Sequence, residues 1–424
     1  MEKRVNGHPS RRFLFSTIEG YGHFHPLVPL ARALKEAGHD VAFAARPSLG
    51  TRVEAAGFTF FPIGADPKQD PEYQQLKALL RMMPTGLETE LFAYPKLFCG
   101  IAPRLRTPDL VEIGRSWQAD MFIREAGEYG AVIAAEHLGL PHATVAFAAA
   151  LKGMSIFEQG AAEQLDPIRR KWGLAPDPDL KALNRYLHLS YSPSGFSTQE
   201  VGGRWVPGGI PATTHHVRPE FFDNAGNESL PDWVGELPAQ PTVYVTLGTE
   251  VNTEPDLYPR VMQTIIAGLR DAKINLIVTL GRDKDPAEFG PQPANVHIER
   301  YIPQSLLLRR CELMVMHGGS NSLLQALDIG IPIVVVPLIA DQFFNAHVAQ
   351  GLRLGPMVQL EQLTPEGIRA AVKEALGDPV YRQNVRRLQA EIHALPGMEH
   401  AVRLVERVAT EREPLLATGL TVIS

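Results

Sequence analysis

The chain has 424 residues, and at about 100–200 residues per domain this length indicates two or three domains. Hydrophobic residues make up 45% of the chain and charged residues 21%, a composition that excludes wholesale disorder. The net charge of −6 argues against a general nucleic-acid-binding protein, because such proteins carry a basic surplus.

Apolar runs with strand-like patterns alternate with helical patterns along the chain, which is typical of βαβ units and a parallel sheet. In the first half we predict strands over residues 12–18, 40–45, 58–62, 121–124 and 142–147. We predict helices over residues 26–37 and 129–139. Residues 64–110 show only weak helical patterns, with methionine and aromatic side chains among them.

The second half repeats the alternation. We predict strands over residues 242–247, 274–280, 296–300, 313–316 and 331–336. We predict helices over residues 257–269, 321–329, 343–352, 364–376, 380–394 and 399–412. The fold class is therefore α/β, with two Rossmann-like, doubly wound parallel-sheet domains expected to face each other across a cleft.

The domain boundaries follow from a stretch without periodicity. Residues 219–241 are rich in Pro, Gly, Asn and Glu, which indicates a linker between a first domain at residues 1–218 and a second at 242–395. We expect residues 396–424 to form a C-terminal helix and tail that pack back on the first domain.

Two further features bear on the compartment. Cys99 and Cys311 are too few and too far apart in sequence for a disulfide framework or a cysteine metal site, so we expect buried thiols in a reducing compartment. The most apolar stretch, residues 329–340, is short and contains two prolines, which argues against a membrane span. Residues 13–18 are a shorter apolar run than the core of a signal peptide. We expect a cytoplasmic protein.

A Gly-rich loop joins the strand predicted at 313–316 to the following helix. It reads His317-Gly318-Gly319-Ser320-Asn321-Ser322. Free N–H groups and the positive end of the helix dipole make such a loop a site for an anion, and the side chains add donors suited to a pyrophosphate. The alternative is that Ser320 and Asn321 only cap the helix.

A second Gly-bearing loop, residues 20–26, follows the first strand and contains His23 and His25. It would lie at the carboxyl edge of a parallel sheet, where open α/β folds bind ligands. An imidazole there is suited to proton abstraction near neutral pH, and the residues alone leave both histidines as candidates. No Gly-Lys-Ser/Thr follows, so this is not a Walker A loop.

Four linked elements extend the second-half motif. They are Tyr301-Ile302-Pro303-Gln304, His317 to Ser322, Gly330-Ile331-Pro332, and Pro337 to Gln342, which ends in Asp341-Gln342. Their order and spacing resemble the nucleotide-sugar signature of the family 1 glycosyltransferases, the UDP-glycosyltransferase superfamily with the GT-B fold. The resemblance also reaches the first half, and the chain is similar to bacterial natural-product glycosyltransferases.

The resemblance implies a role for each signature residue. Tyr301 would stack on the uracil or thymine ring, the backbone of Ile302 would pair with the base, and Gln304 would lie near the ribose. Asp341 and Gln342 would bind hydroxyls of the donor sugar. The remaining implied donor contacts, to the diphosphate, are Thr249, His317, Gly319, Ser320, Asn321 and Ser322.

One signature position departs from the family pattern. The family often has a glutamate eight residues after the signature histidine to bind ribose hydroxyls, and here the residue is Gln325. The uncharged amide leaves the choice between a UDP-sugar, such as UDP-glucose, and a TDP-sugar open.

The family resemblance also assigns the base. The histidine of its Gly-His-x-x-Pro motif deprotonates the acceptor, and that position is His23. An acid that orients this histidine follows a later strand in relatives. Asp120 opens the strand predicted at 121–124, Glu125 closes it and Glu128 lies one helical turn further on, and of these we select Glu125. Glu125 could instead satisfy the dipole of the next helix or pair with Arg124. We expect Met82, Phe92, Phe98 and Phe147 to line an apolar acceptor pocket, although such side chains also simply cover sheets.

We therefore expect an inverting glycosyltransferase, a hexosyltransferase of bacterial secondary metabolism. It would move a hexose from a UDP- or TDP-sugar to a hydroxyl of a small, largely apolar natural product. The nucleotide sugar would be a co-substrate, with no further cofactor and no metal. The protein would be a monomer or homodimer that binds no nucleic acid.

Three alternatives remain. A GT-B nucleotide-sugar epimerase would use carboxylates rather than His23, and a non-catalytic helper of another glycosyltransferase should lack the base or the donor signature. An NAD(P)-binding oxidoreductase expects a third glycine and an acid after the second strand, where this chain has Pro26 and Arg46.

Overall fold

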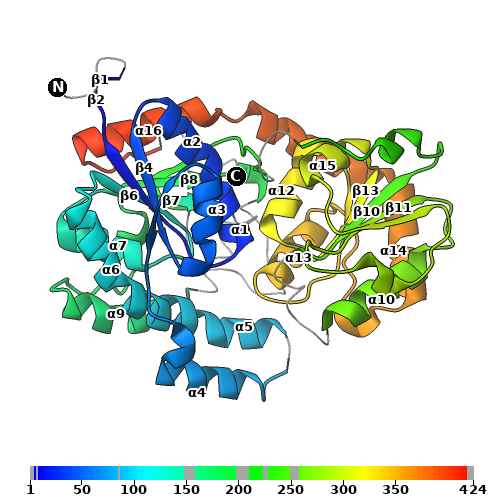
Figure 1. Cartoon of the computed structure of the whole chain (residues 1–424), viewed down its shortest axis with the longest axis horizontal. Coiled ribbons are helices and arrows are strands. Elements are labelled where there is room, and N and C mark those ends of the chain that lie inside the picture. Colours follow the sequence, from blue (N-terminus) through cyan, green and yellow to red (C-terminus); the bar gives the residue numbers. More distant parts are fainter. Residues whose placement is uncertain are drawn as a thin grey trace. The chain divides into compact units, whose positions relative to one another are not determined.

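The computed structural model describes residues 4–5, 8–84, 86–147, 158–196, 210–222, 228–248 and 257–417. The chain folds into two compact units (Figure 1). The described residues of Met1–Ser197, Val206–Glu220 and Leu395–Ser424 form the first unit, and those of Phe221–Ala394 belong to the second.

The first unit contains a seven-stranded parallel sheet with the strand order β5-β4-β3-β6-β7-β8-β9. The strands are β3 (Arg12–Ser16), β4 (Asp40–Ala45), β5 (Thr59–Pro62), β6 (Met121–Glu125), β7 (His142–Ala146), β8 (Leu187–Ser190) and β9 (Thr214–His216). Two-residue strands β1 (Arg4–Val5) and β2 (His8–Pro9) pair separately. Every residue of β6 and β7 is buried, as expected for strands covered on both faces.

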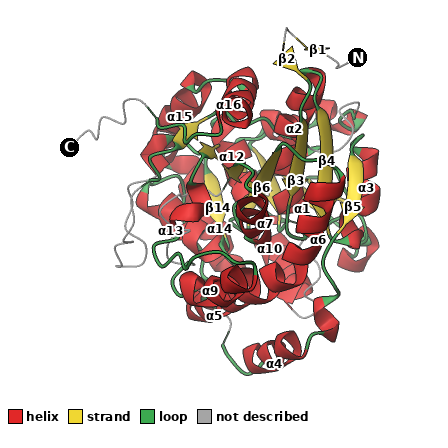
Figure 2. Cartoon of the chain, turned by 90° about the vertical axis from the view of Figure 1, so that its left-hand side faces the viewer, coloured by secondary structure: helices red, strands yellow, loops and turns green. Residues whose placement is uncertain are grey.

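Helices surround this sheet (Figures 1 and 2). They are α1 (Tyr21–Phe24), α2 (Val28–Glu36), α3 (Gly50–Ala55), α4 (Pro71–Leu80), α5 (Leu87–Tyr94), α6 (Ala102–Ser116), α7 (Gly130–Leu138), α9 (Ala161–Lys171) and α16 (Met398–Glu411). A π-helical stretch, Pro95–Ile101, joins α5 to α6. Helix α4 lies at the periphery of the unit, and α16 packs beside α2. Residues 64–110, whose helical patterns are weak, therefore contain several helical segments.

The second unit contains a five-stranded parallel sheet with the order β12-β11-β10-β13-β14. The strands are β10 (Thr242–Thr246), β11 (Asn275–Thr279), β12 (Val296–Glu299), β13 (Leu313–Met316) and β14 (Ile333–Val335). The helices are α10 (Leu257–Leu269), α11 (Gln304–Leu307), α12 (Ser320–Ile329), α13 (Gln342–Gly351), α14 (Pro365–Gly377) and α15 (Pro379–Ala394). The predicted α/β class with two parallel sheets is confirmed.

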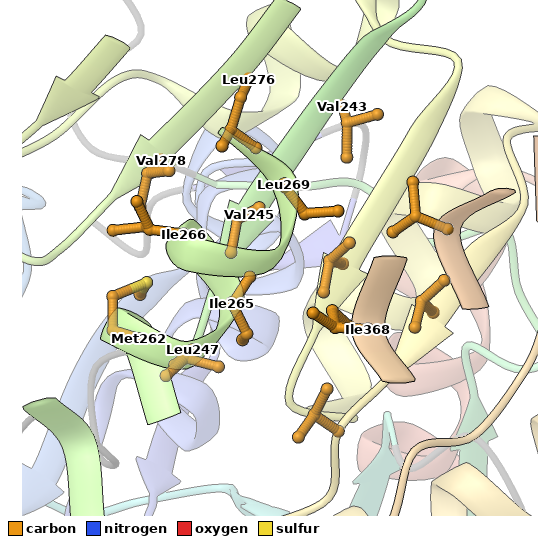
Figure 3. Packing of buried hydrophobic residues seen from close by; sticks show 14 of the residues in the cluster. Val243, Val245, Leu247, Met262, Ile265, Ile266, Leu269, Leu276, Val278 and Ile368 are labelled. Atoms are coloured by element: carbon orange, nitrogen blue, oxygen red, sulfur yellow. The ribbon is translucent and has the colours of Figure 1, made fainter. Parts of the chain in front are cut away.

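Apolar packing of α10 and α14 on this sheet forms one core of the second unit. Figure 3 shows Ile265 and Leu269 of α10 near Val245 of β10 and Ile368 of α14, and all four side chains are inaccessible to solvent. Burying each such side chain is worth about 1.5–3 kcal/mol relative to exposure. This core holds β10, so the loop that follows it starts from a fixed strand end.

The residues predicted as a linker are partly structured. Residues Asp232–Glu236 form a 3₁₀ turn, and the Trp233 ring stacks on His297 of β12 with centroids 4.1 Å apart. From Phe221 onward this segment belongs to the second unit.

Cys99 and Cys311 are buried free thiols, as predicted. Among the described residues, no helix combines the length and apolarity needed to cross a membrane.

Candidate active site

Both candidate loops lie where the strand order of their sheet reverses. In the first unit β3 is followed in space by β4 on one side and by β6 on the other, so the reversal lies between β3 and β6. In the second unit the reversal lies between β10 and β13 in the same way. Ligands of open α/β sheets bind at the carboxyl ends of strands at such switch points. The fold therefore places His23 after β3 and His317 after β13 at the two positions best suited to binding.

The first switch point brings His23 and Glu125 together. His23 lies in α1, and Glu125 is the last residue of β6, which pairs in parallel with β3. The distance from His23 Nδ1 to Glu125 Oε2 is 3.2 Å. The His23 side chain is 36% exposed and that of Glu125 only 1%. The two ring nitrogens of an imidazole are distinct, and here Nδ1 is the one that faces the carboxylate.

Backbone N–H groups hold the Glu125 carboxylate from its other sides. Gly127 donates to Oε2 at 2.8 Å and Ile18 to Oε1 at 3.4 Å. Burial acts to raise the pKa of Glu125, but the His23 charge, the Gly127 hydrogen bond and Arg124 outweigh it, so this pKa lies below its ordinary value. Glu125 is thus an anion positioned to orient the imidazole and stabilise its charged form.

The two alternative roles of Glu125, at the helix dipole or paired with Arg124, do not match its contacts. The acid at the start of α7 is Glu128, which accepts hydrogen bonds from Gly130 N at 3.1 Å and Ala131 N at 2.9 Å. Arg124 donates to backbone carbonyls, including Ala126 O at 2.7 Å. Asp120, at the opposite end of β6, accepts from Arg12 N. Glu125 is the acid that contacts His23.

The competing histidine is in a different environment. His25 packs against Tyr21 and Phe24, with ring centroids 5.5 and 5.9 Å away, and burial lowers the pKa of His25 to about 4. The His23 ring instead lies edge-on to Phe147, 5.7 Å between centroids. His23 therefore combines the carboxylate partner with an aromatic neighbour.

The predicted acceptor residues lie on different segments of the first unit. Phe147 is next to His23, and Phe98 packs on Tyr94 in the π-helical region, 4.8 Å between centroids. Phe92, in α5, lies under the Lys96 ammonium at 3.7 Å. Met82 follows α4 and is 78% exposed. Of the four, Phe147 is the residue whose ring lies beside the candidate base.

In the second unit, two glycines leave room for His317. A Cβ atom at Gly248 would lie 2.6 Å from His317 Nε2, and one at Gly319 would lie 2.4 Å away. Gly248 also has a φ of +71°, in the left-handed region. Burial lowers the pKa of His317 to about 4, so the ring is neutral at pH 7 and has one N–H to donate. The loop can thus bring the imidazole and backbone N–H groups to one ligand.

The residue at the N-cap of α12 has no side chain with which to cap the helix. This residue is Gly319, with no side-chain capping hydrogen bond, so Ser320 and Asn321 do not act as the cap. First-turn N–H groups have no partner within a helix, and the dipole is positive at this end. Ser320 Oγ instead donates to Asp341 Oδ2 at 3.0 Å. This helix end is suited to an anion such as a diphosphate.

Gln304, Ser322 and Gln325 form one hydrogen-bonded group. Gln304 Nε2 donates to Gln325 Oε1 at 3.0 Å and to Ser322 Oγ at 3.3 Å. Tyr244 of β10 donates to Gln304 Oε1 at 3.4 Å and contacts Thr279 at 2.7 Å. The Gln325 carbonyl oxygen therefore accepts a hydrogen bond within this group.

The predicted base-stacking residue is braced by two charged side chains. Tyr301 donates its hydroxyl to Glu228 Oε2 at 2.9 Å, and the Arg282 guanidinium lies 3.9 Å from the centre of the ring. Arg282 also pairs with Glu228 at 3.6 Å. Ile302 is buried, which is compatible with a backbone role. Neither Arg282 nor Glu228 was predicted, because contacts between distant segments leave no local pattern.

The segment after β14 places Asp341 beside the α12 loop, through the Ser320 contact and a second hydrogen bond from Asn345. Gln342 is buried, and its Oε1 accepts from Leu338 N and Ile339 N, both at 3.0 Å. Only the NH₂ group of Gln342 could thus face a sugar.

Thr249 lies outside the described residues. In the part of the chain that is described, no three His, Cys, Asp or Glu side chains converge on a possible metal position.

Comparisons with known proteins agree with this layout. The family model of the glycosyltransferase family 28 N-terminal domain matches residues 13–151. The model described as erythromycin biosynthesis protein CIII-like, C-terminal domain, matches residues 263–408. Together the two ranges span about two thirds of the chain.

Curated relatives match over nearly their whole length. The chain is 27% identical to aklavinone 7-beta-L-rhodosaminyltransferase of Streptomyces galilaeus, over 95% of this chain and 97% of that protein. It is 28% identical to tylactone mycaminosyltransferase of Streptomyces fradiae, over 95% and 93%. It is 27% identical to 3-alpha-mycarosylerythronolide B desosaminyl transferase of Saccharopolyspora erythraea, over 95% and 100%.

Solved structures show the same fold. Glycosyltransferase VinC in complex with DTDP superposes with a TM-score of 0.74 at 24% identity, covering 94% of this chain and 100% of that one. Streptomyces sp. SF2575 glycosyltransferase SsfS6, complexed with thymidine diphosphate, gives 0.70 at 25% identity, covering 94% and 99%. The chain therefore belongs to the family 1 glycosyltransferases of the GT-B fold, and it is a glycosyltransferase.

Proposed function

We propose that this glycosyltransferase transfers a hexose, with inversion and without a metal ion, from a nucleoside diphosphate sugar to a hydroxyl of a small, largely apolar acceptor. The observation that carries the proposal is the contact between His23 Nδ1 and the buried Glu125 carboxylate. A histidine oriented in this way is a general base at neutral pH.

The proposed reaction is a single displacement. His23 Nε2 takes the proton of the acceptor hydroxyl while the acceptor oxygen forms a bond to the anomeric carbon. The bond from that carbon to the diphosphate oxygen breaks, and its electrons leave with the diphosphate. Attack opposite the leaving group inverts the anomeric configuration. Glu125 stabilises the imidazolium, and its low pKa keeps it ionised for this purpose.

The departing diphosphate gains charge as the bond breaks. We propose that the N-terminus of α12 and the His317 imidazole stabilise this charge through N–H groups, without formal positive charge. Fixed dipoles aimed at developing charge are usually the largest catalytic contribution in such sites.

For the donor, we propose a thymidine diphosphate deoxyhexose rather than UDP-glucose. The Gln325 amide is uncharged and its carbonyl oxygen already accepts from Gln304, so it is a weaker acceptor for the ribose 2′-hydroxyl than the glutamate frequent at this position in the family. Thymidine lacks that hydroxyl. The names of the relatives specify rhodosamine, mycaminose and desosamine transfer, and SsfS6 binds thymidine diphosphate. These observations support the same donor class.

For the acceptor, we propose an apolar natural-product aglycone that lies against Phe147, beside the base. Relatives are named for aklavinone, tylactone and an erythronolide. An aromatic face 5.7 Å from the His23 ring would hold an apolar scaffold with its hydroxyl near Nε2. We propose the cytoplasm as the compartment in which this occurs.

A donor and acceptor panel tests the proposal. TDP- and UDP-sugars are combined with polyketide, phenolic and steroid acceptors, with and without EDTA, and products are read by mass and anomeric NMR. We expect an acceptor mass increase of one deoxyhexose, an inverted linkage and no EDTA effect. Release of an epimerised monosaccharide without acceptor modification would instead support the epimerase alternative.

A further inference from the structure

Asn345 connects three parts of the proposed donor site. It lies in α13, one helical turn after Asp341, and is 1% exposed. Its Nδ2 donates to Gly318 O at 2.8 Å, to Asp341 Oδ2 at 3.0 Å and to Ser320 Oγ at 3.1 Å. One amide therefore contacts the loop backbone, the first residue of α12 and the carboxylate predicted to bind the sugar.

The contacts fix the orientation of this amide. Gly318 O and Asp341 Oδ2 can only accept hydrogen bonds, so the NH₂ group and not the carbonyl must face them. The Asn345 Oδ1 atom, on the other side, is buried and has no partner among the described residues. Leaving an acceptor unsatisfied is unfavourable, so the favourable hydrogen bonds of this side chain are those of its NH₂ group.

The same contacts restrict Asp341. Its Oδ2 accepts from both Asn345 Nδ2 and Ser320 Oγ, each at 3.0 Å. With Oδ2 held in this way, the second carboxylate oxygen has a defined direction. A movement of the α12 loop on diphosphate binding would be transmitted to Asp341 through these two hydrogen bonds.

We propose that Asn345 is a positioning residue that couples the diphosphate loop to Asp341, so that the carboxylate is oriented for the donor sugar. This inference rests on the proposed nucleotide-sugar site. In this proposal Asn345 helps the protein to bind the intact donor more tightly than the free nucleoside diphosphate. It does so without contacting either molecule.

The chain offers a matched control in Asn275. This residue is also 1% exposed, and its Nδ2 donates to Pro238 O, Gln240 O and Thr242 Oγ1 at 3.0–3.2 Å. It lies at the start of β11, whereas the donor loop follows the carboxyl ends of β10 and β13. Asn275→Ala therefore removes a comparable buried hydrogen-bonding group without touching the coupling.

The experiment measures dissociation constants by calorimetry for TDP and TDP-glucose, and for UDP and UDP-glucose. The readout is the ratio of nucleotide to nucleotide-sugar dissociation constants, for whichever pair the wild type binds more tightly. We expect Asn345→Ala to lower this ratio about fivefold or more, as loss of an oriented charged hydrogen bond would, and Asn275→Ala to leave it unchanged. An unchanged ratio in folded Asn345→Ala overturns the inference.

A double-mutant cycle separates positioning from general loosening. If Asn345 acts through Asp341, adding Asn345→Ala to Asp341→Ala lowers the ratio no further. Additive losses in the double variant would contradict coupling through Asp341. A wild-type ratio near one would also contradict it, because the sugar would then contribute nothing to binding. A wild type that binds neither nucleotide pair would contradict the proposed function itself.

Discussion

Replacing Glu125 by glutamine tests how the protein prepares its proposed base. The change keeps the size of the side chain and removes its charge. At present Glu125 Oε2 lies 3.2 Å from His23 Nδ1 and 2.8 Å from Gly127 N. In one orientation of the glutamine amide, its oxygen takes the place of Oε2, and its NH₂ group takes the place of Oε1 and faces Ile18 N. The variant therefore keeps a histidine at the site but loses the anion that stabilises the imidazolium.

The expected loss can be estimated from the geometry. Two unit charges 3.2 Å apart at an effective dielectric constant of about 20 attract by on the order of 5 kcal/mol. Because the His23 side chain is 36% exposed, solvent screening reduces this value. We expect about 3–4 kcal/mol, which corresponds to a rate loss of about 10²- to 10³-fold in kcat.

The assay measures initial rates of nucleoside diphosphate release with the donor and acceptor pair found in the panel, together with TDP affinity. Glu128→Gln is the control, since Glu128 is equally buried and contacts Ser16 Oγ and the start of α7. It should lose stability but little rate. A Glu125→Gln rate within a few-fold of wild type, or an equal loss in Glu128→Gln, would refute the reasoning.

Three further predictions concern the donor site and stability. Gln325→Glu adds an acceptor oxygen beside the Gln304 amide, so the ratio of kcat/KM for UDP- over TDP-sugars should rise about tenfold in competition assays. Gly319→Ala puts a Cβ within 2.4 Å of His317 Nε2, and calorimetry should show TDP binding weakened by about tenfold or more, with no loss for Gly377→Ala, where the space is open. Burial lowers the pKa of His188 to about 3, whereas the unfolded chain has the ordinary value of 6.5. As the pH falls below 6.5, the unfolded state therefore binds a proton that the folded state does not, and the free energy of unfolding falls by on the order of 1 kcal/mol per pH unit. Urea unfolding of His188→Gln should therefore show a shallower loss between pH 7 and 5 than wild type, and equal slopes would contradict this.

Much of the fold was predictable because local patterns and tertiary packing agree. The strand at Asp40–Ala45, the helix at Leu257–Leu269 and the strand at Leu313–Met316 have the predicted bounds. Helix α6 escaped prediction because Pro103 and Pro108 interrupt its pattern, although packing in the unit accommodates both. Strand β8 was not predicted, although apolar and polar residues alternate along its four positions.

The site divides in the same way. Glu125 could be selected because a residue that closes a parallel strand lies at the edge where His23 was expected. Asn345 could have been found from its spacing of four residues after Asp341, which places both on one helical face. The pairing of Tyr301 with Glu228 joins segments 73 residues apart, and no local pattern indicates such a contact.

The central claim is that a glycosyltransferase base lies at His23, and His23→Ala tests it most directly. The measurement is product formation by mass in the variant, with the panel's best donor and acceptor, alongside TDP binding to the same sample. We expect transfer to fall by at least about 10²-fold, as for loss of a general base, while TDP affinity stays unchanged. Full transfer activity in folded His23→Ala would contradict the account.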